Sequence, residues 1–135
     1  MNVLAKAAFA LGFGMTACCV QAQQALSPEA FDDYTRGKTL NYASDGQIYG
    51  AEIYRENRRV TWSFLDGECQ DGTWYGQNDQ ICFLYENSAG PSCWKFFMTA
   101  TGLRAEFISE TSSIELYETT QRASEMICLG PEIGV

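Results

Sequence analysis

The sequence of 135 residues contains no histidine, which excludes reactions that need an imidazole as general base or zinc ligand. Lysine and arginine are scarce, nine against seventeen aspartates and glutamates, and the formal net charge is −8. A chain of this charge is poorly suited to a phosphate backbone, so we expect no nucleic-acid partner. With 46% hydrophobic and 19% charged residues, the composition is typical of one globular domain.

Long apolar runs are missing except near the N-terminus. Residues 7–20 are apolar or small, follow Lys6 and lead to Ala22, where the small residues favour signal-peptidase cleavage. The run is shorter than the ~20 apolar residues of a membrane-spanning helix. We therefore predict a signal peptide over residues 1–22, no transmembrane segment, and a periplasmic or secreted domain over residues 23–135.

A second export signal overlaps the first. Residues 15–18 loosely match the tetrapeptide that ends in the lipidated cysteine of a lipoprotein. Lipidation would anchor the protein at Cys18 and leave Cys19 as a single thiol in an oxidising compartment, a situation that exported proteins tend to avoid. Ordinary cleavage is therefore favoured, and a lipid anchor at Cys18 is the alternative.

Four cysteines follow the signal peptide, and no two of them form a Cys-x-x-Cys pair. In an exported chain this even number predicts two disulfides rather than a metal cluster. A hairpin on either side of residues 87–91 would set Cys82 opposite Cys93. By elimination Cys69 pairs with Cys128, although four cysteines allow three connectivities.

One short helix is predicted at about residues 27–36, because Ser27 is a good N-cap, Pro28 suits the first helical position and Gly37 is a stop signal. Farther along, residues alternate with a period of two and are punctuated by pairs such as Asp71-Gly72. This pattern predicts strands at about 38–44, 47–55, 58–65, 72–76, 80–86, 92–98, 102–108 and 113–118.

The connections between these strands are short, and short connections produce antiparallel neighbours. We therefore predict a mainly β fold, an up-and-down meander of about eight strands with one short N-terminal helix. Eight strands can close into a small barrel whose interior is filled by side chains or holds one small ligand. A strongly curved open sheet, with the helix over one edge, is the alternative.

Four segments carry a resemblance to known sequences. Residues 59–69, 72–75, 81–86 and 93–96 combine a Gly-x-Trp motif with a cysteine strand and a Cys-Trp strand. Together they resemble a group of small secreted alphaproteobacterial proteins of unknown function. The resemblance implies an exported, disulfide-containing β-meander domain over nearly all of the mature chain, and it brings no catalytic or binding residues.

Catalytic groups are few. Without histidine, a serine, cysteine or threonine nucleophile could use only Lys38 or Lys95 as its base. Acid pairs of the kind used in glycoside hydrolysis are conceivable, but turn acids are usually solvated turn formers. We therefore expect a non-catalytic protein with no cofactor and no metal. The candidate acids are Asp66, Glu68, Asp71, Asp79 and Glu86.

Aromatic residues, 13% of the chain, are the strongest indication of binding. Most of them are expected to fill the core, but an aromatic pocket or patch is predicted around Trp62, Trp74 and Tyr75. The expected function is an exported non-catalytic barrel that binds an apolar small molecule or an envelope protein. The alternative is an envelope-associated structural or inhibitor protein that acts through a surface loop, such as residues 66–79.

Overall fold

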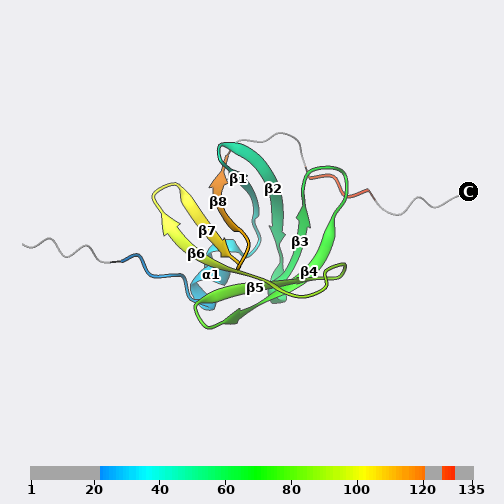
Figure 1. Cartoon of the computed structure of the whole chain (residues 1–135). Helices are drawn as coiled ribbons and strands as arrows, with labels where there is room; N and C mark the ends of the chain where they lie inside the picture. Colours follow the sequence, from blue (N-terminus) through cyan, green and yellow to red (C-terminus); the bar gives the residue numbers. More distant parts are fainter. Residues whose placement is uncertain (1–21, 121–125, 130–135) are drawn as a thin grey trace, which may run out of the picture.

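The computed structural model describes residues 22–120 and 126–129, which form a closed antiparallel barrel (Figure 1). Strands follow one another in sequence order, and the last pairs with the first. The predicted meander is therefore confirmed, and it closes as a barrel. The strands are β1 (Thr39–Ser44), β2 (Gln47–Tyr54), β3 (Arg59–Ser63), β4 (Gln70–Gln77), β5 (Gln80–Tyr85), β6 (Ser92–Thr99), β7 (Gly102–Ile108) and β8 (Ser113–Thr119).

The helix α1 (Pro28–Thr35) lies at the end of the barrel away from the β1–β2 turn (Figure 1). Ser27 caps it, with its side-chain oxygen accepting a hydrogen bond from the Ala30 amide at 3.1 Å. Phe31 is fully buried and packs with its ring centroid 4.5 Å from that of Phe96. The helix thus closes one end of the barrel. No helix of the described residues is long and apolar enough to cross a membrane.

Local turn chemistry explains the tightest hairpin. Asp45 and Gly46 join β1 to β2 with φ of 49° and 75°, the left-handed values that a two-residue hairpin turn requires. A short 3-10 turn, η1 (Glu56–Arg58), joins β2 to β3. In contrast, the turn expected at Asp71-Gly72 does not form, because both residues pair with β3 inside β4.

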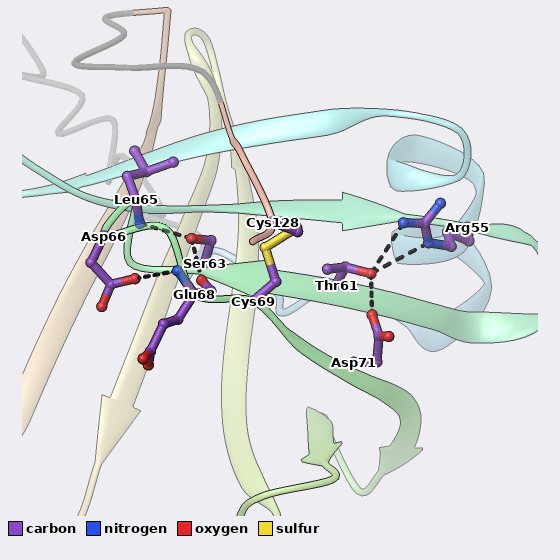
Figure 2. The surroundings of a disulfide bond; sticks show 9 residues. All are labelled: Arg55, Thr61, Ser63, Leu65, Asp66, Glu68, Cys69, Asp71 and Cys128. Atoms are coloured by element: carbon purple, nitrogen blue, oxygen red, sulfur yellow. Dashed lines mark hydrogen bonds between the residues drawn. A yellow bond between two sulfur atoms is a disulfide. The ribbon is translucent and has the colours of Figure 1, made fainter. Parts of the chain in front are cut away.

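The third strand is shorter than predicted, and the fourth is longer. β3 ends at Ser63 because Leu65 has a φ of 62° and its amide donates to the Ser63 hydroxyl at 2.9 Å. The same hydroxyl donates to the Glu68 carbonyl at 2.7 Å, which fixes the β3–β4 loop (Figure 2). β4 extends over Gln70–Gln77, so the suggested loop 66–79 is largely strand.

Both predicted disulfides are present. Cys82 of β5 lies directly opposite Cys93 of β6 and is bonded to it. Cys69, at the end of the β3–β4 loop, is bonded to Cys128 (Figure 2). The amide of Leu129 also donates to the Gly67 carbonyl at 3.0 Å, so the C-terminal segment is attached beside this loop. The predicted signal peptide, apart from Ala22, and the alternative anchor at Cys18 lie outside the described residues.

Candidate ligand-binding site

The barrel interior holds a cavity of about 340 Å³. Every strand contributes at least one lining residue, because alternate residues of each strand point inward. Tyr54, Phe83 and Phe96 line the cavity and also contact the ring of Phe31, so they form its floor above α1. Phe64 and Ser88, from the β3–β4 and β5–β6 loops, line the opposite end. The cavity therefore extends from the α1 side toward the loops.

Three aromatic rings meet at the loop end, and we call them the mouth cluster: Tyr49, Trp62 and Phe64. The Trp62 ring centroid lies 5.9 Å from that of Tyr49 and 5.4 Å from that of Phe64. The Phe64 side chain is exposed, with 51% of its surface accessible. Phe64 also lines the cavity, so its exposed ring lies where the cavity meets solvent.

The backbone explains how the mouth cluster is placed. The register of β1 on β2 shifts between Tyr42 and Ala43, so that Tyr49 is the extra residue of a β-bulge. A Cβ on Gly50 would lie 2.3 Å from the Trp62 ring and 2.6 Å from the Ser63 carbonyl oxygen. The indole therefore lies against the backbone of β2, where only glycine leaves room for it.

A carboxyl group lies inside the barrel. Glu52 of β2 lines the cavity, and only 2% of its surface is accessible. The phenol of Tyr85 donates to it, with the phenol oxygen 3.1 Å from Oε1 and 3.0 Å from Oε2. Within residues 22–120 and 126–129, no lysine or arginine forms an ion pair with this group. Burial raises the pKa of Glu52 well above its ordinary value, while the bond from Tyr85 lowers it.

Two further phenols form a buried polar pair. The hydroxyls of Tyr42 and Tyr54 lie 2.8 Å apart, and both residues line the cavity. Burial is the main reason that the pKa values of both phenols are raised, so they stay neutral. One phenol donates its hydrogen to the oxygen of the other, so the accepting phenol still has its own hydrogen available for another acceptor. The interior thus offers hydroxyl donors and one carboxyl among apolar walls.

The three residues of the predicted aromatic patch occupy different places. Trp62 lines the cavity. Trp74 is buried at the closed end, with its ring centroid 5.1 Å from that of Phe31 and the Arg58 guanidinium 4.5 Å from its own ring. Tyr75 points outward from β4, opposite Cys82, and is 37% exposed. The structure therefore does not bring their side chains together.

The candidate acids lie outside the barrel. Asp66 accepts from the Glu68 amide at 3.0 Å, as expected for a turn former. Asp71 accepts from the Thr61 hydroxyl at 2.6 Å, and Arg55 donates to the same hydroxyl at 3.2 Å (Figure 2). Asp79 forms an ion pair with Lys95 at 3.0 Å, which lowers its pKa. Each of these three acids therefore has a structural partner.

Two acids do meet at an outer groove. Asp71 and Glu86 line it together with Arg55 and Arg59. Neither here nor in the rest of the described part of the chain is a group of three cysteine, aspartate or glutamate side chains placed to hold a metal ion. The groove is mixed in charge, unlike the interior cavity, whose lining contains no lysine or arginine.

The interior carboxyl is the feature that the sequence interpretation missed. Glu52 is separated by one residue from Gly50 and from Tyr54, so all three share the inward face of β2. This alternation along β2 was the sequence signal that could have placed Glu52 inside the barrel, because it puts the acid on the same face of the strand as residues of the core. No family model, curated protein or solved structure matches this chain. The resemblance to secreted alphaproteobacterial proteins stays a prediction.

Proposed function

We propose that this chain is an exported, non-catalytic binding protein that carries a small, largely apolar molecule inside its barrel. The observation that carries the proposal is the interior cavity of about 340 Å³. Ligand pockets have volumes of about 300–1,000 Å³ and combine mostly apolar walls with a few polar groups. The cavity has this composition, with aromatic walls and the polar groups of Glu52, Tyr42 and Tyr85.

The chemistry of the cavity favours binding over catalysis. Among its lining residues, Glu52 is the one acid, and lysine and arginine do not occur. A mechanism that uses two carboxylates would need a second acid facing the first. The two disulfides support a periplasmic or secreted location, because disulfides persist in oxidising compartments.

The test is a fluorescence titration of the mature protein with N-phenyl-1-naphthylamine, a neutral probe whose emission rises in apolar surroundings. Ala105 is 1% exposed and lines the cavity, so the larger side chain of Ala105→Leu should fill part of the cavity. The affinity for the probe should then fall at least about tenfold. Ala100→Leu adds the same atoms at an exposed turn and should bind like wild type. If Ala105→Leu does not fold, as judged by circular dichroism, Leu116→Phe replaces it.

Two results would reject the carrier function. One is the absence of saturable probe binding by wild-type protein. The other is unchanged affinity in the folded cavity variant, since this would place the probe on the outer surface.

A protein partner is the second candidate, favoured by the β3–β4 loop. Exposed Phe64 projects from a loop that the Cys69–Cys128 disulfide and the Ser63 hydrogen bonds hold in place. A rigid loop with an exposed ring suits an inhibitor or an envelope-associated structural protein. Native mass spectrometry of the protein from its own periplasm separates the two functions. Retained small-molecule mass supports the carrier, whereas a bare barrel in a stoichiometric complex with another protein supports the alternative.

A further inference from the structure

We infer that the ligand is a small organic cation, with an ammonium group paired to Glu52 and an apolar body held between the aromatic walls. The inference rests on the proposed carrier function and specifies the chemical class of its ligand. Three features of the interior carry it: an acid without a cationic partner, aromatic rings beside that acid, and the lack of cationic side chains that would pair with an anion.

The first feature is the incomplete set of partners around Glu52. A carboxylate has about four acceptor positions, and the Tyr85 phenol can supply one hydrogen. Buried acids are normally paired with a cation, because an uncompensated charge is costly away from water. Here the side chain is 2% exposed and lines a cavity, and the described residues provide it with no ion pair. An ammonium in the cavity would supply both the charge and the missing hydrogens.

The second feature is the aromatic wall next to this acid. Glu52 and Trp62 lie directly opposite each other on β2 and β3, so their side chains are neighbours on the inward face. The Trp62 ring centroid is 6.4 Å from that of Tyr42 and 5.9 Å from that of Tyr49. The faces of tryptophan and tyrosine rings attract ammonium groups, and sites for organic ammonium ligands use such rings.

The third feature is the exclusion of anions. The cavity lining includes neither lysine nor arginine, so no positive charge in it would compensate a buried carboxylate or phosphate. The chain as a whole has a formal charge of −8, so the field around it also favours cations. A neutral alcohol can bond to the phenols but gains nothing from the charge of Glu52. Charge is therefore the property by which this site would select its ligand.

The raised pKa of Glu52 is consistent with this role. Burial favours the neutral acid while the cavity is empty, and the phenols of Tyr42, Tyr54 and Tyr85 around it are neutral as well. When an ammonium ion binds, the carboxyl proton leaves to solvent and the two charges form a pair. The empty barrel thus avoids a buried charge, and the occupied barrel compensates it.

The experiment compares three molecules of nearly the same shape by isothermal titration calorimetry of the mature protein. 2-Phenylethylamine is the cation, 2-phenylethanol is neutral and 3-phenylpropanoate is the anion. Wild type should bind the amine at least about tenfold more tightly than the alcohol, and the anion most weakly. Glu52→Gln keeps the shape of the side chain and should abolish the preference for the amine over the alcohol. Glu110→Gln, which removes an exposed acid from the β7–β8 loop, should keep it.

Glu52→Met provides a second variant in case Glu52→Gln does not fold, because it replaces the acid with an unbranched apolar side chain of similar length. It should likewise abolish the preference for the amine over the alcohol. The inference is overturned if wild type binds alcohol as tightly as amine, or if folded Glu52→Gln or folded Glu52→Met keeps the preference. It also fails if the wild-type protein binds N-phenyl-1-naphthylamine but does not bind the amine. If the wild-type protein binds neither molecule, the carrier function itself is rejected.

Discussion

The phenol of Tyr85 reaches both carboxyl oxygens of Glu52, at 3.0 and 3.1 Å, although β5 and β2 are not neighbours in the barrel. Two strands, β3 and β4, lie between them, and Gly72 on β4 makes this contact possible. It pairs with Tyr85, and a Cβ at this position would lie 2.9 Å from the Tyr85 ring and 2.5 Å from the Leu84 carbonyl oxygen. The polar centre of the cavity thus depends on a residue without a side chain.

Gly72→Ala should therefore displace Tyr85 and destabilise the barrel by about 1–3 kcal/mol, as overpacking of a well-packed site does. Two of the crowded atoms, the Leu84 carbonyl oxygen and the Tyr85 Cα, belong to the backbone, so a side-chain rotation alone cannot relieve the contact. Urea denaturation of Gly72→Ala and Gly90→Ala measures the difference. A Cβ on Gly90 meets nothing within 4 Å, so that control should stay within about 0.5 kcal/mol of wild type. Equal stability of both variants would contradict the proposed crowding.

Glu52→Gln should stabilise the empty protein increasingly as the pH rises. Below the ordinary pKa of 4.5, both the folded and the unfolded wild-type chain hold the proton, so the pH does not affect the contribution of Glu52. Above it the unfolded chain releases the proton while burial retains it in the folded state. The wild type then loses up to about 1.4 kcal/mol per pH unit, until the pH passes the raised pKa of the folded state.

Glutamine does not titrate, so the difference in unfolding free energy between Glu52→Gln and wild type should grow from about pH 4.5 upward. Thermal and urea unfolding across this range measure it. Glu110→Gln, at an exposed position, should show no comparable trend. A constant difference between Glu52→Gln and wild type would show that burial does not raise the pKa of Glu52.

Phe31→Ala should lower the free energy of unfolding by about 3–5 kcal/mol, the range for a buried phenylalanine, and should open the floor of the cavity. The ring is fully buried and contacts those of Tyr54, Trp74 and Phe96. Denaturant unfolding gives the cost. Phe64→Ala removes an equal volume from an exposed ring and should cost less than about 1 kcal/mol. Similar costs for the two variants would exclude the role of α1 as the structural closure of the barrel.

The disulfide between Cys69 and Cys128 should contribute more stability than the one between Cys82 and Cys93. Their sequence separations are 59 and 11 residues, and the chain-entropy model gives about 4 and 3 kcal/mol, respectively. Paired alanine variants, compared by urea denaturation, measure each contribution. A reversed order would mean that packing around Cys82, which is fully buried, outweighs loop entropy.

Local sequence signals were sufficient for most of the architecture. The cap at Ser27, the alternation of the strands and the Asp45-Gly46 turn act within a few residues, so they can be recognised without tertiary structure. The pairing of Cys82 with Cys93 followed from the register of a single hairpin. The same local logic was wrong at Asp71-Gly72, where pairing with β3 and β5 keeps the chain in a strand.

The amino-acid sequence by itself determined a mainly β chain with one short helix, and it indicated both disulfides, because turn preference, alternation and hairpin register are local properties. Only the tertiary structure decided that the sheet closes around a cavity and that Glu52, Tyr85 and Trp62 line it together. Glu52 and Tyr85 belong to β2 and β5, which do not pair, so their contact depends on the curvature of the sheet. The cavity as a whole depends on closure between β1 and β8, and the mouth cluster depends on the bulge at Tyr49. Alternation along β4 turns Trp74 to the inside and Tyr75 to the outside, so the closed barrel keeps Tyr75 apart from Trp62, which lines the cavity.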